Sequence, residues 1–320
     1  MQMSGQFRSF CVLVRDMKEI KVSSFAKINF SIDVTGVLDN GMHLVDMIMH
    51  QIAFHDDVTM QYTPEEHRSE GDVEIQLETN RYYLPVDERN LAYKAAQIMI
   101  NHFAKEAGVG SGIIRISITK SIPVAAGLAG GSGNGAAVLI GLNRLWNLKL
   151  DTRQLCRIGE ELGSDVPFCV LVQNSRYRAA LATGRGEVLH PLKKCMKKYV
   201  VLAKPSFGVS TKEVFKCIDD YEITQRPDNG ELIRGLAAGD DRLVYKNMIN
   251  VLELYTLDHY EPVAQLKEIC RTQTPAEMVL MSGSGPTVFA VYASEKEARS
   301  ACQLLRGMRY EAYWAGTDGR

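Results

Sequence analysis

The feature that most constrains the fold is a glycine-rich segment at residues 123–135, Pro-Val-Ala-Ala-Gly-Leu-Ala-Gly-Gly-Ser-Gly-Asn-Gly. Alternating apolar residues predict a strand before it, over 113–119, and apolar residues at helical spacing predict a helix after it, over 135–146. Glycines at such a junction expose successive backbone N–H groups, and the helix N-terminus adds unpaired donors and a partial positive charge. The segment therefore predicts a site for an anion, most naturally a phosphate chain, rather than a flexible linker.

Two other phosphate-binding patterns fit the segment less well. A Walker loop is excluded because neither Gly-Lys-Ser nor Gly-Lys-Thr occurs in the chain. The degenerate dinucleotide fingerprint matches at Gly131, Gly133 and Ala136, but in that fold the strand runs directly into the first glycine. Here ten residues separate Lys120 from Gly131, and the segment after Trp146 is predicted as another helix. We therefore expect a phosphate site of another kind.

Predicted strands and helices are interleaved without a strict period, which favours an α+β fold over a doubly wound parallel sheet. The predicted strands cover residues 21–35, 45–54, 57–62, 73–78, 113–119, 171–183, 199–203, 277–281 and 288–292. The predicted helices begin near Leu91 and cover 135–146, 151–162, 212–221, 240–250 and 262–271, while 225–230 is predicted as a loop.

The length of 320 residues favours two lobes with a cleft between them. We place the division after residue 170, which gives an N-terminal domain at 18–170 and a C-terminal domain at 171–320. Residues 1–17 are predicted to be an extension, because Met17-Lys18 begins a more conventional sequence. Truncation before Met17 is expected to preserve folding and activity.

Composition excludes several classes of protein. The 37 basic and 38 acidic residues give a net charge of -1, which provides no overall field for a nucleic acid or an anionic membrane. No apolar run approaches the roughly 18 residues of a membrane span. The seven cysteines are scattered without a Cys-x-x-Cys pair, which favours buried thiols in the cytoplasm.

Four segments together resemble the GHMP small-molecule kinases, over residues 18–293. They are 26–29 with 40–43, 123–137, 162–168 and 281–290. The resemblance implies a lobe like ribosomal protein S5, followed by an α/β-sandwich lobe, with the active site in the cleft. It also implies ATP, Mg²⁺ and an alcohol acceptor. The motifs are most similar to those of family members that phosphorylate the 2-hydroxyl, a tertiary alcohol, of a cytidylylated methylerythritol.

The resemblance assigns catalysis to Lys27 and Asp165. Asp165 would accept the proton of the hydroxyl and orient it, and Lys27 would lie beside it and polarise the hydroxyl or the γ-phosphate. Without the resemblance, Asp165 would be interpreted as a helix cap and Lys27 as a solvated strand lysine. Two alternatives stay open: a mevalonate-type or homoserine-type acceptor, and a catalytically silent nucleotide or sugar sensor. Retention of both residues argues against a sensor.

The resemblance also assigns binding residues. Those for ATP are Asn90, Lys120, Pro123, Val124, Ala125, Ala126, Gly127, Leu128, Ala129, Gly130, Gly131, Ser132, Gly133 and Asn134. Those for the acceptor are Asn29, His43, Phe215, Gly283, Ser284 and Gly285. Ser132 is a candidate for contacting Mg²⁺, whose other ligands are not assigned, and both a monomer and a homodimer are compatible with the sequence.

The chain departs from the family pattern at three places. Ser132-Gly133-Asn134 has one hydroxyl fewer than the usual motif, and Met42 replaces one of two aromatic residues expected around the cytosine. We expect Met42 to weaken cytosine binding without abolishing it, because a methionine can still pack on a ring edge. Residues 173–178 contain a short insertion for which the sequence offers no explanation.

Overall fold

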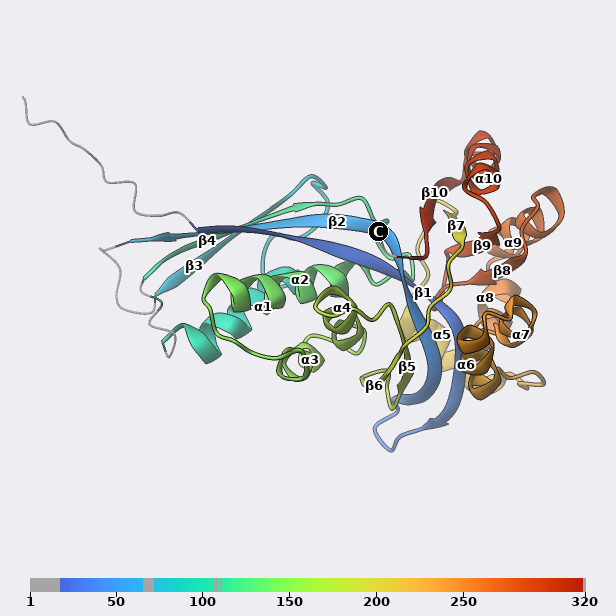
Figure 1. The fold of residues 1–320 in the computed structure, drawn as a ribbon, viewed down its shortest axis with the longest axis horizontal. Helices are drawn as coiled ribbons and strands as arrows, with labels where there is room; N and C mark the ends of the chain where they lie inside the picture. The colour runs from blue at the N-terminus through green and yellow to red at the C-terminus, as the bar shows by residue number, and fades with distance from the viewer. Residues whose placement is uncertain (1–17, 66–71, 106–108, 110, 319–320) are drawn as a thin grey trace, which may run out of the picture.

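The computed structural model describes residues 18–65, 72–105, 109 and 111–318, and the predicted extension at 1–17 lies outside them. Within these residues the first sheet has six strands, in the order β3-β4-β2-β5-β6 with β1 paired to β2. Its strands are β1 (Lys18–Val37), β2 (His43–Pro64), β3 (Val73–Thr79), β4 (Gly112–Thr119), β5 (Ala179–Thr183) and β6 (Val188–Leu192). One face is covered by α1 (Leu91–Met99), α2 (Gly130–Leu145), α3 (Thr152–Glu160) and α4 (Val166–Gln173), as Figure 1 shows. A π-helical turn (Ile100–Ala104) follows α1.

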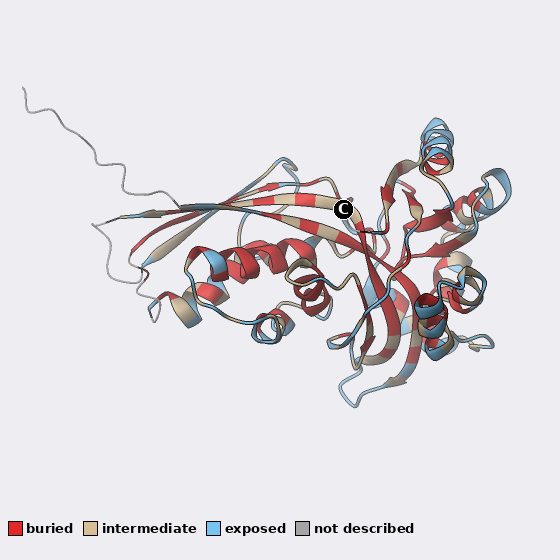
Figure 2. Cartoon of the chain, in the orientation of Figure 1, coloured by how far each residue is buried: buried red, intermediate tan, exposed pale blue. Residues whose placement is uncertain are grey.

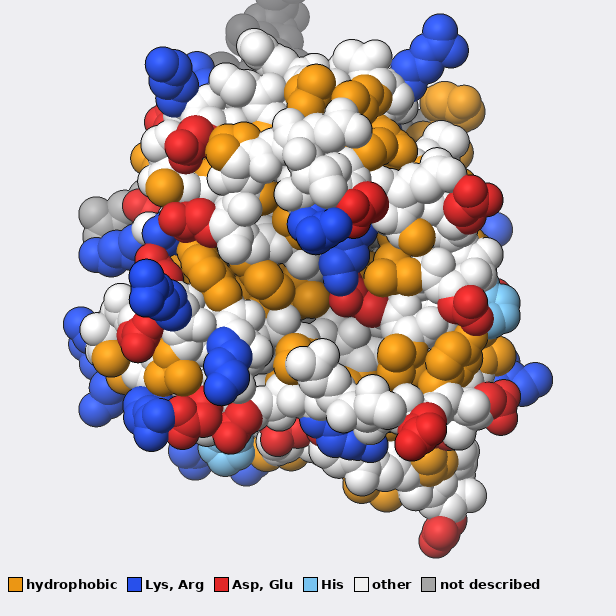
Figure 3. Space-filling view, turned by 90° about the vertical axis from the view of Figure 1, so that its right-hand side faces the viewer, with side chains coloured by type: hydrophobic (Ala, Val, Ile, Leu, Met, Phe, Trp, Pro, Cys, Tyr) orange, Lys and Arg blue, Asp and Glu red, His pale blue; other side chains and the backbone are white. Residues whose placement is uncertain are grey.

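The second sheet has four strands in the order β10-β7-β9-β8. They are β7 (Tyr199–Lys204), β8 (Met278–Met281), β9 (Val288–Tyr292) and β10 (Glu311–Gly316). Its helices are α5 (Thr211–Cys217), α6 (Asn229–Ala238), α7 (Asp241–Asn247), α8 (Glu253–His259), α9 (Glu261–Gln273) and α10 (Glu295–Gly307), and a 3-10 turn (Ile218–Asp220) follows α5. On the face seen in Figure 3, basic and acidic side chains are interspersed.

The long β1–β2 ribbon bends from the first lobe onto the second, as Figure 1 shows. Its register shifts between Phe25 and Lys27 and again between Asn29 and Ser31. Beyond the bend, the N–H of Ile32 donates to the carbonyl of Ile249 at 2.9 Å. Lys27 and Asn29 therefore lie between two irregularities, where the two lobes meet.

Within the part of the chain that the structure describes, buried side chains form three clusters, and two of them join the lobes. One lies within the first lobe, between the sheet and α1–α4. The second combines Met47 and Phe168 of the first lobe with Val201 of the second. The third combines Ile28 with Phe289 in the same way. Figure 2 shows the resulting band of buried residues through the ribbon and the sheet of the second lobe.

The α+β architecture is confirmed, but some elements differ from the prediction. The strand predicted over 171–183 is wrong at its start, because Val166–Gln173 forms α4 and β5 begins only at Ala179. Every residue from Val166 to Val172 is buried. A helix that is apolar on all sides has no 3.6-residue period to distinguish it from a buried strand.

Several other helix and strand boundaries differ from the predicted ones. The two strands predicted over 45–54 and 57–62 are one continuous strand, β2. The predicted loop at 225–230 runs into α6, whose N-cap Asp228 accepts from the N–H of Glu231 at 2.9 Å. The helix predicted over 240–250 ends at Asn247. The division at residue 170 falls inside α4 and stays a prediction, while β5 and β6 beyond it still belong to the first sheet.

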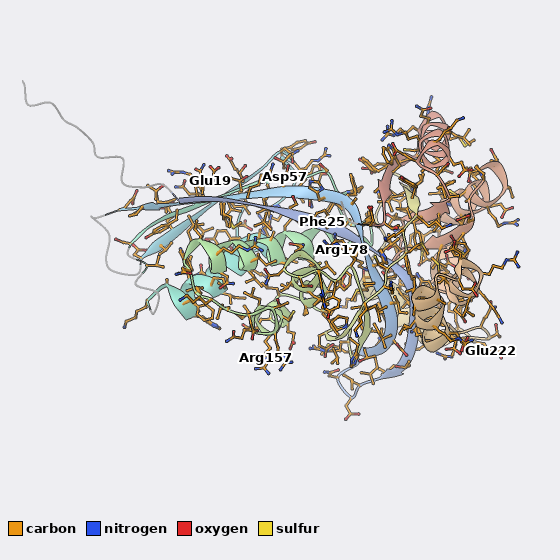
Figure 4. All side chains as sticks on the ribbon, in the orientation of Figure 1. Glu19, Phe25, Asp57, Arg157, Arg178 and Glu222 are labelled. Carbon is orange, nitrogen blue, oxygen red and sulfur yellow. The ribbon has the colours of Figure 1, made fainter. Side chains whose placement is uncertain are left out.

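Of residues 173–178, interpreted from the sequence as an insertion, Gln173 ends α4 and 174–178 form a bend before β5. The Nη1 group of Arg178 donates to the carbonyls of Val172, Ser175 and Tyr177 at 2.9–3.2 Å. These bonds satisfy carbonyl groups at the C-terminal end of α4 and just beyond it, which a helix end otherwise leaves unpaired. Arg178 lies at the junction of the lobes in Figure 4. Within the described residues, no helix has both the length and the apolar character needed to cross a membrane.

Candidate active site

The glycine-rich segment has a backbone suited to an anion. Positive φ angles occur at Ala125, Gly127 and Ala129 (51°, 70° and 56°), separated by residues without them. Such alternation turns successive N–H groups towards one side and forms an anion-binding concavity. The segment leads into α2, which begins at Gly130, five residues earlier than predicted. The first N–H groups of α2 therefore point at the same place.

This segment forms one wall of a pocket of about 360 Å³. The lining residues are Leu84, Pro85, Arg89, Asn90, Leu91, Lys120, Pro123, Val124, Ala125, Ala126, Gly127, Leu128, Ala129, Gly130, Gly131, Ser132, Asn134, Asp165 and Thr211. All the residues assigned to ATP by resemblance are among them except Gly133. A Cβ atom on Gly133 would lie 2.6 Å from the Ser24 hydroxyl, so this glycine lets α2 pack against β1 instead.

Sequence reasoning missed five of these lining residues. Leu84, Pro85, Arg89 and Leu91 surround Asn90, which caps α1 by accepting from the N–H of Ala92 at 3.0 Å. They precede or begin a helix that the sequence did predict, so proximity to Asn90 was the available signal. Thr211 comes from α5 in the second lobe, and nothing in the linear sequence placed it near the glycine segment.

The loop at 282–285 closes against the glycine segment. The Ser282 hydroxyl donates to the carbonyl of Gly127 at 3.0 Å. A Cβ atom on Gly127 would lie 2.3 Å from the backbone oxygen of Ser282, so only glycine permits this approach. The hydroxyls of Ser284 and Thr211 share a hydrogen bond of 2.8 Å. The central and C-terminal motifs, far apart in sequence, therefore form one structure.

Lys27 and Asp165 lie together beside the pocket. The Nζ atom of Lys27 is 3.9 Å from Oδ2 of Asp165 and donates to Oδ1 of Asn29 at 2.6 Å. The Lys27 side chain is 6% exposed and that of Asp165 is 32% exposed, so the carboxylate is the more accessible group. Oδ1 of Asn29 also accepts from the N–H of Gly283 at 3.1 Å. Asn29 thus connects the lysine to the C-terminal loop.

A buried polar network lies at the inner wall of the pocket. Nζ of Lys120 donates to Oδ1 of Asn134 at 3.1 Å and forms an ion pair with Asp56. The Asn134 amide donates to Oδ2 of Asp56 at 2.9 Å and to the Ser24 hydroxyl at 3.0 Å. Burial lowers the pKa of Lys120, and the Asp56 carboxylate opposes that shift. Asp56 was not predicted as a site residue.

The residues assigned to the acceptor meet across the lobes. Nε2 of His43 lies 3.1 Å from both carboxylate oxygens of Asp219, so this nitrogen carries the proton. The rings of His43 and Phe215 are 5.3 Å apart and inclined at 48°. The sulfur of Met42 lies 3.7 Å from Nη1 of Arg185. An aromatic and polar surface therefore forms between β2 and α5.

The donors available for Mg²⁺ fit an ion held mainly by a nucleotide. No group of three or more histidine, cysteine or acidic side chains suited to a metal occurs among the residues that the structure describes. Mg²⁺ bound with nucleotides typically takes one or two protein oxygens and otherwise phosphate and water. The Ser132 hydroxyl and the Asp165 carboxylate both line the pocket and can supply such oxygens.

Comparisons with known proteins agree with this geometry. Models of the GHMP kinase N-terminal and C-terminal domains match residues 90–173 and 232–306. A 4-diphosphocytidyl-2-C-methyl-D-erythritol kinase from Alkaliphilus metalliredigens is 41% identical over 289 residues, covering 90% of this chain and 93% of the relative. Another, from Exiguobacterium sibiricum, is 43% identical over 294 residues, covering 92% and 96%.

A crystal structure of a 4-(cytidine 5'-diphospho)-2C-methyl-D-erythritol kinase is also similar. It superposes with a TM-score of 0.75 at 26% identity, covering 93% of this chain and 98% of that one. The shared fold, the two domain models and the high identity over nearly the whole length lead to one assignment. The chain belongs to the GHMP kinases and, within them, to the family of 4-diphosphocytidyl-2-C-methyl-D-erythritol kinases.

Proposed function

We infer that this protein is a kinase that phosphorylates the 2-hydroxyl of 4-(cytidine 5'-diphospho)-2-C-methyl-D-erythritol. ATP is the phosphoryl donor, and the products are the 2-phosphate and ADP in the non-mevalonate route to isoprenoid precursors. The observation that carries this inference is the placement of Lys27 and Asp165 beside the glycine-lined pocket, in a chain 41% identical to a kinase of that name.

In the proposed reaction the hydroxyl oxygen attacks the γ-phosphorus of ATP, and the bond from that phosphorus to the bridging oxygen breaks. The hydroxyl proton passes to Asp165, whose carboxylate is accessible from the pocket. The Lys27 ammonium offsets negative charge at the transferring group. Because the transition state of phosphoryl transfer is loose, catalysis depends mainly on holding the reactants in line, so Asp165 also orients the hydroxyl.

The nucleotide would lie along the glycine segment, with its phosphates at the start of α2 and Asn90 and Lys120 nearby. Mg²⁺, held by the phosphates together with Ser132 or Asp165, would neutralise charge on them. Both the metal and the assignment of individual site residues are part of this proposal.

The acceptor would be held by residues from both lobes. His43 and Phe215 offer a hydrogen-bonding ring and an aromatic face for the cytosine, while Asn29, Gly283, Ser284 and Gly285 lie nearer the reacting hydroxyl. Asp219 fixes the orientation of the His43 ring. Met42 leaves one face of this surface without an aromatic ring, so we expect weaker stacking on the base. A cytoplasmic location and the oligomeric state stay predictions.

The test is an ADP-release assay with ATP and Mg²⁺ and three acceptors: the cytidylyl-methylerythritol compound, mevalonate and homoserine. We expect turnover with the first alone and a loss of at least about 100-fold in Asp165→Asn. Turnover on another alcohol would preserve the mechanism and refute the substrate. If none of the three acceptors gave ADP release while ATP still stabilised the protein against heat, the result would favour a nucleotide sensor.

A further inference from the structure

Asp56 is a fully buried carboxylate that the proposed reaction does not use. It lies in β2 opposite Ser24 of β1. Its Oδ1 accepts from the backbone N–H groups of Ser121 and Ile122 at 2.7 and 2.8 Å. Its Oδ2 accepts from the Asn134 amide at 2.9 Å and from the Lys120 ammonium. A buried charge is tolerated when it is compensated this fully.

Two features of this arrangement concern the nucleotide pocket. Ser121 and Ile122 come immediately before the glycine segment, so Asp56 holds the backbone at the point where that segment begins. Lys120 and Asn134 both line the pocket. Asp56 itself does not line it, so any influence on a bound nucleotide is exerted through these neighbours.

Counting partners among the described residues, Lys120 has one donor left for a ligand. An ammonium group has three N–H bonds, and Asp56 and Asn134 account for two of them. A Cβ atom on Gly130 would lie 3.1 Å from Nζ of Lys120, so the glycine leaves room for the ammonium beside the start of α2. The third N–H is therefore available at the place where the backbone donors of the segment converge.

The charge of this buried lysine depends on its neighbours. Burial is the main cause that lowers the pKa of Lys120, and Arg81 acts in the same direction. Asp56 is the group that raises it. Without the carboxylate, the ammonium would lose its counter-charge while staying buried, and it would release its proton at a lower pH.

We propose that Asp56 is a positioning residue of the nucleotide site, which keeps Lys120 charged and fixed at the inner wall of the pocket. This rests on the proposed function only in that a nucleotide occupies the pocket. Asp56 acts through Lys120, Asn134 and the backbone before the glycine segment. Its removal should therefore weaken nucleotide binding and make that binding sensitive to pH.

The experiment measures the Kd of ADP with Mg²⁺ by calorimetry from pH 7.5 to 9.5, which requires no acceptor. In Asp56→Asn we expect Kd about tenfold higher at pH 7.5 and rising further with pH, because neutral Lys120 binds phosphate less well. The unaltered protein should give a nearly flat profile. A flat profile in Asp56→Asn, with Kd unchanged, would overturn the proposal.

Asp57→Asn is the matched control, because Asp57 is the next residue in β2 and its side chain points to the opposite face of the sheet. There it pairs with exposed Lys21 at 2.9 Å. Figure 4 shows Asp57 on the side away from the helices. We expect its Kd profile to match that of the unaltered protein. The same pH dependence in this control would assign the effect to general surface charge and contradict a role for Asp56.

A second pair of variants covers the case in which Asp56→Asn does not fold. Lys120→Met should bind ADP more weakly than the unaltered protein, and both it and Asp56→Asn/Lys120→Met should bind ADP without pH dependence, because the titrating ammonium is absent from both. ADP binding by Lys120→Met as tight as that of the unaltered protein would overturn action through Lys120, whether or not Asp56→Asn folds. If the unaltered protein bound no ADP, the nucleotide pocket itself would be refuted, and the proposal with it.

Discussion

Lys27 is the residue at which the chemistry can be tested most directly. Its ammonium is buried, bonded to Asn29 and 3.9 Å from Asp165, so it is fixed before any substrate binds. We expect Lys27→Met to lower kcat by about 100-fold or more, because a fixed cation near developing charge contributes that much. Lys21→Met, on the same strand with its side chain 60% exposed, is the control and should keep full activity.

Steady-state kinetics with the cytidylyl acceptor would decide between two roles for Lys27. A fall in kcat with little change in KM supports action on the transferring group. A rise in KM for ATP with kcat preserved would instead make Lys27 a residue that only binds the nucleotide.

Two glycines of the pocket should respond differently to the same small change. A Cβ atom on Gly127 would meet a backbone oxygen at 2.3 Å at a φ of +70°, whereas one on Gly131 would make an ordinary 3.8 Å contact with Leu91. We expect Gly127→Ala to lower the free energy of unfolding by about 2 kcal/mol or more. Gly131→Ala should fold normally and raise the KM for ATP. Urea denaturation measures the free energy of unfolding, and steady-state kinetics measures the KM for ATP. Equal values of both quantities in the two variants would contradict this prediction.

Without the family resemblance, which paired Lys27 with Asp165, sequence reasoning could place at the site only residues that lie near one another in the chain. The glycine segment was predicted from its own composition, because exposed N–H groups and a helix start are local properties. Asp56 and Thr211 were missed, since strand pairing brings Asp56 to Lys120 and Asn134 behind the pocket wall, and packing between the lobes brings Thr211 to the pocket. No periodicity or spacing in the chain records such contacts.

At the scale of elements, β2 contains a histidine that should make stability depend on pH. His50 is fully buried, and burial lowers its pKa to about 4, below its ordinary value of 6.5. The folded state therefore holds it neutral, while the unfolded chain takes up a proton below pH 6.5. The stability that comes from holding His50 neutral is fully present above pH 6.5 and is lost as the pH falls towards 4.

Between pH 7 and pH 5, protonation of His50 in the unfolded chain should lower the free energy of unfolding by about 2 kcal/mol. His50→Gln should remove that part of the pH dependence, whatever its effect at neutral pH. Urea denaturation at both pH values measures it, with His55→Gln as the control because that side chain is 40% exposed. An unchanged slope in His50→Gln would show that His50 is not held neutral.

The burial pattern explains the outcome for α3 and α4, but not for every element: fully buried β9 was predicted with its observed bounds, whereas α10, which begins with a capping box, was not predicted. α3 alternates exposed and buried residues and begins with a capping box at Asp151, so both its period and its start were visible. Residues 166–172 of α4 are all buried, so no helical period was visible; residues 171–173 were predicted as the start of a strand and the rest of the helix was not predicted. α6 was missed because its start follows a proline-containing stretch typical of a loop.

For the whole molecule, the cores imply that the two lobes unfold together. One core cluster joins Met47 to Val201 and another joins Ile28 to Phe289, so neither sheet can lose its partner without exposing apolar surface. The chain has two tryptophans, and they lie in different lobes. Trp146 packs on the core of the first lobe, and Trp314 lies in β10 of the second.

The variant Trp314→Phe keeps only Trp146, so its fluorescence reports on the first lobe. The variant Trp146→Phe keeps only Trp314, so its fluorescence reports on the second lobe. In each variant we expect the urea midpoint measured by fluorescence to equal the midpoint measured by circular dichroism. The shared cores make the two lobes a single cooperative unit. ADP should raise both midpoints equally, since its pocket takes residues from both lobes. A midpoint for Trp314 fluorescence that separated from the circular dichroism transition would mean that the second lobe is an independent domain. The cores that join the lobes would then contribute little to cooperativity, and the active site between them could open without unfolding the glycine segment.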